Sequence, residues 1–153
     1  MLTLQDLREV CDRYVPLASR HERSFSGPAW WPAHEIGHLL VAKPAEIGEP
    51  LFGIGDVFDN ADAKYVTAAR QRYLLTVECA AMIVSRRLLI AAGKRSLATD
   101  EAEDTDHDTM TWWFDNGGRV TEFLRLRCPG VPRSRTRLEA LCAMALRRAG
   151  RAR

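Results

Sequence analysis

Features that define several classes of protein are missing from this sequence of 153 residues. It contains no run of about 18 apolar residues, so we expect no transmembrane helix and no membrane partner. Residues 1–6 lack the basic and apolar regions of a secretory signal peptide, which favours a cytoplasmic location. No internal repeat or low-complexity stretch divides the chain. Its length suits a single domain, residues 1–153, with a core of its own.

Cysteine motifs are absent as well. The four cysteines lie far apart and form no CxxC pair; they are Cys11, Cys79, Cys128 and Cys142. In a chain without an export signal we expect them to be reduced and to pack as small apolar side chains. A disulfide framework or a four-cysteine zinc site is therefore not expected.

Charge is unevenly distributed, although the whole chain carries only +2. Residues 119–153 contain ten arginines and two acids, a net charge of +8, which leaves −6 for residues 1–118. A basic segment of this kind can attract nucleic acid or an acidic protein. Because no aromatic residues are interleaved in 131–153, we interpret the basic part as a solvated helix face and expect no nucleic-acid partner.

The sequence His34-Glu35-Ile36-Gly37-His38 is the strongest functional signal. Residues four apart on a helix share one face, so both histidines can bind the same metal ion. Glu35 is about 100° around the helix from His34, where it can reach a metal-bound water without being a ligand itself. This spacing is typical of zinc-dependent hydrolases. Pro32 suits the first turn of the helix that carries the motif.

The spacing of apolar residues predicts a mainly α protein. Besides the motif helix at 33–42, we expect helices at 3–14, 62–92, 110–116, 120–127 and 134–148. The first should end before Pro16, and the longest should end with Gly93 at its C′ position. Residues 44–60, rich in glycine and proline, are expected to be irregular, with a short strand or hairpin at 51–58.

A catalytic zinc ion usually has three protein ligands and an open fourth position, so one more ligand is needed. Asp106 is one candidate, because a helix that begins near it would align it with Met110 and Trp113. Glu78 is the other, because it lies among small and apolar residues in the expected core helix. From the residues alone, each carboxylate has another explanation: Asp106 as a helix-start acid, and Glu78 as the partner of a nearby arginine.

The run from His34 to Ala42 resembles the zinc-binding helix in the peptidase domain of FtsH-like AAA+ proteases. This resemblance implies a zincin-like helical metallopeptidase domain with Zn²⁺ as its cofactor. It also implies an Asp at the start of a later helix as third ligand, matched here by Asp106. Small regulatory metallopeptidases of the ImmA/IrrE-like group also share the motif, and they imply Glu78 instead. The helix-start context and the spacing after His38 favour Asp106.

We therefore expect a zinc metallopeptidase in which His34, His38 and Asp106 bind the metal and Glu35 is the general base. Its substrate is a protein or peptide with an accessible segment. No ATP is expected, because residues 93–96 lack the earlier glycine of a Walker A motif. The alternative is a regulatory or binding protein that has a structural metal or none and acts through its Arg-rich C-terminal helices. The sequence leaves the oligomeric state open.

Overall fold

The computed structural model describes residues 1–18, 27–47 and 67–150, and this part of the chain is mainly helical. Six α-helices and one short 3-10 helix contain about 80% of these residues, and no strand occurs among them. The expectation of a mainly α protein is confirmed. The expected strand or hairpin at 51–58 lies outside the described residues. In chain order the elements are α1 (Leu4–Ala18), α2 (Trp31–Val41), η1 (Pro44–Glu46), α3 (Ala68–Ala91), α4 (Arg95–Asp104), α5 (His107–Arg127) and α6 (Arg135–Arg148).

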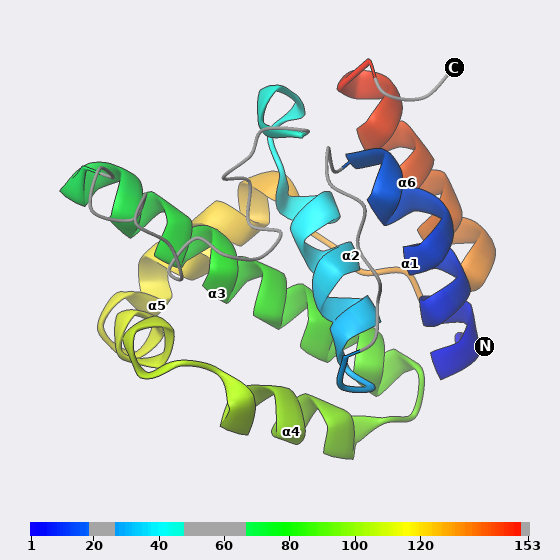
Figure 1. Cartoon of the computed structure of the whole chain (residues 1–153), viewed down its shortest axis with the longest axis horizontal. Coiled ribbons are helices and arrows are strands. Elements are labelled where there is room, and N and C mark those ends of the chain that lie inside the picture. The colour runs from blue at the N-terminus through cyan, green and yellow to red at the C-terminus, as the bar shows by residue number, and fades with distance from the viewer. Residues whose placement is uncertain (19–26, 48–66, 151–153) are drawn as a thin grey trace.

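Helix α2 occupies the middle of the fold, with α3 packed along one side and α1 and α6 on another (Figure 1). Most of its apolar side chains are buried, among them Ile36 and Leu39, which are 0% exposed. Burying side chains of this size stabilises a fold by about 1.5–3 kcal/mol each, so the short helix is held mainly by packing. Pro32 lies in the first turn, as predicted, where its missing N–H breaks no helical hydrogen bond.

Helix α3 is the longest element and has clear signals at both ends. Thr67 is its N-cap, because its side-chain oxygen accepts a hydrogen bond from the backbone N–H of Arg70 at 3.2 Å. At the other end Gly93 has a φ of +71°, the left-handed conformation that glycine adopts without strain. The predicted end of this helix is confirmed. Residues 62–66, where the predicted helix began, lie outside the described part.

Three elements differ from the sequence prediction. Helix α1 was predicted to end before Pro16 but continues to Ala18, because burial of the Val15 and Ala18 side chains stabilises one further turn of helix. Residues 95–104, which were not among the predicted helices, form α4. The two helices expected between 110 and 127 are joined as α5, which has a kink at Asn116 in place of a complete break.

Helices α1 and α6 lie side by side at the edge of the fold (Figure 1). Their shared face is apolar, and Leu138 and Cys142 of α6 are fully buried. Beside this face Arg135 forms ion pairs with Asp6 and Glu9 of α1. All four cysteines are buried and free, as expected.

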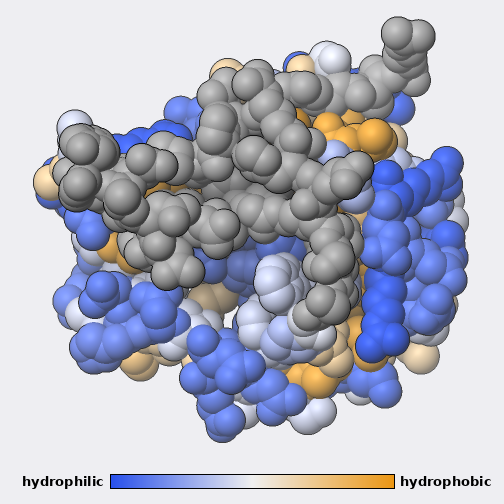
Figure 2. Space-filling view, viewed as in Figure 1, coloured by the Kyte–Doolittle hydropathy of each residue, from blue (hydrophilic) through white to orange (hydrophobic). Residues whose placement is uncertain are grey.

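The face of the molecule in Figure 2 is largely hydrophilic where α1 and α4 reach the surface, and apolar side chains appear there in small patches. Among the described residues, no helix combines the length and apolar character required to cross a bilayer. The largest exposed apolar side chains include Phe114 and Leu126, both on α5.

The core of α3 provides a test of the fold. Leu88 is fully buried, so Leu88→Ala should lower the free energy of unfolding by about 2–5 kcal/mol through lost burial and the cavity it leaves. Ile90, two residues further on, is 36% exposed, and Ile90→Ala should cost about 1 kcal/mol or less. Urea denaturation of both variants measures the difference. Equal losses would contradict the packing of α3.

Candidate metal centre

Two histidines of α2 point in the same direction from successive turns. The ring centroids of His34 and His38 are 4.7 Å apart, and their Nε2 atoms are separated by 3.0 Å. This is the shared face that the four-residue spacing predicts. Both side chains are sheltered from solvent, with 12% of His34 and none of His38 exposed. Two imidazole nitrogens therefore meet at one point against the face of α3.

Glu78 brings a carboxylate to the same point from the middle of α3. Its Oε1 lies 3.0 Å from Nε2 of His34, and its Oε2 lies 3.0 Å from Nε2 of His38. The donor atoms of these three residues all lie within 4.8 Å of one another. The Glu78 side chain is 27% exposed, so solvent reaches one side of the group. We call His34, His38 and Glu78 the metal-site triad.

Asp106, which the sequence favoured as third ligand, has a different position. It is the N-cap of α5: its Oδ1 accepts a hydrogen bond from the backbone N–H of Thr109 at 2.9 Å, and its Oδ2 accepts one from the Thr109 hydroxyl at 2.7 Å. A carboxylate used in this way satisfies the free N–H groups of a helix start. Asp106 is not part of the metal-site triad that the described residues form. The geometry thus favours Glu78, the competing candidate, over Asp106.

Gly37 allows α2 and α3 to approach closely enough for the triad to form. A Cβ atom at this position would lie 2.4 Å from the backbone carbonyl oxygen of Ala81, well inside van der Waals contact. Ala81 lies within α3, so its carbonyl group cannot rotate away as a flexible side chain can. The small residue is therefore required by the distance between the two helices, which explains the glycine in the motif.

The triad is built to stabilise positive charge. Burial alone would lower the pKa of His34, but the carboxylates of Glu78 and Glu101 outweigh this effect and raise the pKa to about 10. Burial alone would raise the pKa of the Glu78 carboxyl, yet His38 and His34 hold it well below its usual range. An imidazolium between carboxylates is thus favoured in the metal-free protein. A divalent cation bound to the same atoms would replace these protons.

The donor set and its spacing fit a zinc ion. Zinc takes nitrogen and oxygen ligands at about 2.0–2.1 Å in a tetrahedron, which separates neighbouring ligand atoms by about 3.4 Å. The three nearest contacts within the metal-site triad are each 3.0 Å. The two Glu78 contacts involve different oxygens, and with one donor atom from each residue the atoms lie within 4.8 Å of one another, which is close enough for all three to reach one ion after side-chain adjustment. Two histidines and one glutamate also form a common ligand set for hydrolytic zinc.

Glu35, the expected general base, directly follows His34 in the sequence. Its side chain is buried, with only 2% exposed. Its Oε1 accepts a hydrogen bond from the indole N–H of Trp31 at 2.7 Å. Its Oε2 has no hydrogen-bond partner among the described residues. A buried carboxylate oxygen without a donor is costly, and a water molecule or a ligand in the site would satisfy it.

Glu101 of α4 is a site residue that the sequence analysis did not single out. It is 2% exposed, its Oε1 lies 2.7 Å from Nδ1 of His34, and its Oε2 accepts a hydrogen bond from the hydroxyl of Ser85 at 2.7 Å. Its spacing from Leu97 and Ala98 provides a signal, because these residues share one face of a helix at four-residue and three-residue intervals. This spacing is informative only if residues 95–104 are already known to form a helix, which the sequence analysis did not predict.

Tyr73 and His107 have contacts outside the metal-site triad. The Tyr73 hydroxyl donates a hydrogen bond to the carboxylate of Glu46. Burial, together with this contact, raises the pKa of Tyr73 to about 12. His107 lies at the start of α5, where its Nε2 is 3.5 Å from the hydroxyl of Thr111. Neither belongs to the metal-site triad.

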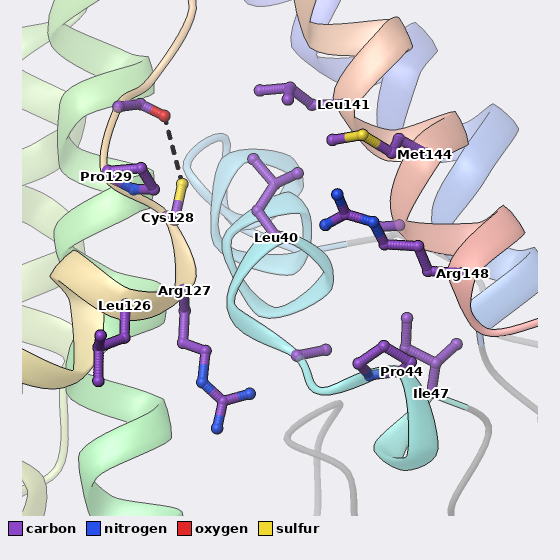
Figure 3. Close-up of a pocket in the computed structure, with 13 residues that line it drawn as sticks. Leu40, Pro44, Ile47, Leu126, Arg127, Cys128, Pro129, Leu141, Met144 and Arg148 are labelled. Carbon is purple, nitrogen blue, oxygen red and sulfur yellow. Dashed lines mark hydrogen bonds between the residues drawn. The ribbon is translucent and has the colours of Figure 1, made fainter.

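A separate pocket of about 390 Å³ opens between the end of α2, the end of α5 and helix α6 (Figure 3). Leu40, Leu141 and Met144 line its apolar part, and Arg127 and Arg148 are basic residues of its wall. Its lining contains no histidine and no acid. The pocket therefore lacks the groups needed for hydrolysis, and the metal-site triad is the stronger candidate.

Comparison with known proteins adds no family assignment. No protein-family model matches the chain, and no solved structure matches it either. The resemblance to known metallopeptidases therefore depends on the motif in α2. Since one fold can have many functions, the argument for function depends on the chemistry of the triad and of Glu35.

The close approach at Gly37 can be tested with a matched pair of glycine substitutions. Gly37→Ala should lower the free energy of unfolding by about 1–3 kcal/mol, because the new Cβ must push α2 away from α3. Gly118 also lies in a helix, but a Cβ there would meet no atom within 4 Å. Gly118→Ala should therefore stabilise the protein by up to about 1 kcal/mol. Urea denaturation reports both values, and a stabilising Gly37→Ala would contradict the close packing.

Proposed function

We propose that this chain is a zinc-dependent metallopeptidase that hydrolyses peptide bonds in accessible segments of proteins. The observation that carries the proposal is the meeting of His34, His38 and Glu78 at one point, in a helix that also holds the buried carboxylate of Glu35. Three protein donors leave the fourth position of a tetrahedral zinc ion open, which distinguishes catalytic from structural sites.

A zinc ion held by His34, His38 and Glu78 would polarise the carbonyl of the peptide bond and would lower the pKa of a water molecule to near 7. The protein supplies the ligands and their orientation. His34 and His38 are held by one rigid helix, and Glu78 approaches from α3 on the side that solvent reaches. A peptide substrate can enter from that open side.

Glu35 is the general base in this proposal. The indole of Trp31 occupies one oxygen of its carboxylate, so the other oxygen is the atom that accepts a proton from the attacking water. Glu35 then gives this proton to the nitrogen of the leaving amine. Because Trp31 and Glu35 are four residues apart on α2, the hydrogen bond holds the base in a fixed orientation relative to the histidines.

The proposed substrates are flexible or extended protein segments. This sequence contains no Walker A motif. These residues therefore provide no ATP-driven unfolding of substrates for the proposed site. Folded regions hold their backbone in hydrogen-bonded helices and sheets, which a metal site cannot reach. Accessible loops and tails are therefore the segments that we expect to be cleaved.

Zinc binding tests the choice of third ligand. The wild-type chain should bind one zinc ion, as measured by metal analysis and by competition with a chromogenic chelator. Glu78→Gln should weaken binding by at least about 100-fold, since even the loss of an outer partner of a ligand can cost 10–100-fold. Asp106→Asn should leave the affinity unchanged within about 3-fold, because Asn is an equally good N-cap. The reverse ranking would restore Asp106 as the third ligand.

Substitution of the base separates metal binding from hydrolysis. Glu35→Gln should retain zinc but reduce cleavage of a disordered protein such as casein by about 10²–10⁴-fold, the usual contribution of a general base. Glu103→Gln is the control, because Glu103 is an exposed acid on α4. Cleavage is followed by gel electrophoresis and mass spectrometry. A wild-type chain that binds zinc but cleaves no disordered substrate would favour the alternative, a binding protein with a structural metal.

A further inference from the structure

We infer that Glu101, itself held by Ser85, is the positioning residue that orients His34 toward the metal and sets the affinity of the site. The inference rests on the proposed zinc centre and adds to it a residue from a third helix. It assigns a function to α4, which is otherwise a short polar helix at the edge of the fold. Neither Glu101 nor Ser85 is proposed to contact the metal or the substrate.

The two ring nitrogens of His34 have different partners. Nε2 points into the metal-site triad, 3.0 Å from Oε1 of Glu78, whereas Nδ1 lies 2.7 Å from Oε1 of Glu101. A carboxylate oxygen can only accept a hydrogen bond, so the proton of the neutral ring resides on Nδ1. This leaves the lone pair of Nε2 for the metal. Glu101 thus fixes both the tautomer and the plane of the ring.

The Glu101 carboxylate is fixed from its other side. The hydroxyl of Ser85, fully buried in α3, donates a hydrogen bond to its Oε2 at 2.7 Å. The hydroxyl of Thr105 donates to the backbone carbonyl of Glu101 at 2.7 Å, which ties the end of α4 to the same residue. With one oxygen on Ser85 and the other on His34, Glu101 has little freedom to turn.

Charge balance gives a second reason for this carboxylate. Two neutral histidines and the Glu78 carboxylate bound to a zinc ion carry a net charge of +1 in a sheltered site. The buried charge of Glu101 would bring the sum for the ion, the three ligands and Glu101 to zero. A buried charge without a partner is costly, so Glu101 and the metal stabilise each other through His34.

A purely structural explanation is that Glu101 ties α4 to α3 through Ser85 and has no effect on the metal. The two roles lead to different measurements. A structural tie affects the free energy of unfolding of the metal-free chain and leaves zinc affinity unchanged. A positioning residue changes zinc affinity and the hydrogen bond at Nδ1 of His34.

The experiment compares zinc affinity in Glu101→Gln, Ser85→Ala, Glu103→Gln and wild type by chelator competition. Glu101→Gln keeps the size of the side chain and removes its charge, so we expect a 10–100-fold loss of affinity. Ser85→Ala keeps the charge and removes one restraint, so its loss should be smaller. Glu103→Gln makes the same chemical change at an exposed position of α4 and should leave the affinity at the wild-type value.

A second readout follows the proton on His34 in the zinc-loaded protein by ¹⁵N and ¹H NMR. In wild type we expect a protonated Nδ1 whose proton resonates far downfield, because a hydrogen bond to a carboxylate is strong. In Glu101→Gln this resonance should move upfield or be lost to exchange with water. Urea denaturation of the metal-free variants shows whether each one is folded.

The outcomes separate the two proposals. A wild-type chain that binds no zinc overturns the metal centre and the role of Glu101 together. Zinc affinity that falls in Glu78→Gln but is equal in wild type and Glu101→Gln overturns the role of Glu101 and leaves the centre intact. If Glu101→Gln is unfolded without metal, Ser85→Ala and the NMR resonance of His34 decide the question. The inference is overturned if Ser85→Ala binds zinc with the wild-type affinity and wild type shows no downfield Nδ1 proton.

Discussion

The short distance between α2 and α3 at Gly37 is the constraint on which the candidate site depends. Without a Cβ at this position, the backbone of α2 lies against the carbonyl group of Ala81. Glu78 lies on the same helix as Ala81, less than one turn earlier, so the same contact brings its carboxylate to His34 and His38. A helix pair kept apart by larger side chains would separate these atoms beyond the reach of one metal ion.

Close packing of this kind concentrates polar groups in the core, which is costly unless each group has a partner. Glu78 and Glu101 lie against two histidines in the interior of a small helical protein, and Glu35 is buried on the helix that carries these histidines. Glu101 and Glu78 contact imidazole rings. The second oxygen of Glu35 has no hydrogen-bond partner among the described residues, so it is available to a small polar molecule. Such an excess of buried acid over base stabilises a bound cation more than it stabilises the fold. This balance is typical of functional sites.

The parts of the fold and site that could be predicted from sequence are those encoded locally. The shared face of His34 and His38 follows from their spacing alone, and the end of α3 follows from Gly93. The third donor could not be decided, because a contact between α2 and α3 depends on how two distant helices pack. Asp106 satisfies its own helix start, and nothing in the sequence shows that Thr109 occupies both of its oxygens.

Helix α4 was missed for a related reason, and its position indicates how the site and the fold depend on each other. Its N-cap, Lys94, makes no capping hydrogen bond through its side chain, and few of its residues are apolar, so local signals for a helix are weak. Packing and the contacts of Glu101 with α2 and α3 hold it in place. The groups that would hold a metal or orient its ligands therefore come from three helices. Metal binding stabilises a folded state that has the site preformed, because the unfolded chain cannot assemble these donors. In this protein the atoms that would bind a cation join α2 to α3, and the contact of Glu101 with His34 joins α4 to them, so metal binding would also stabilise this part of the fold.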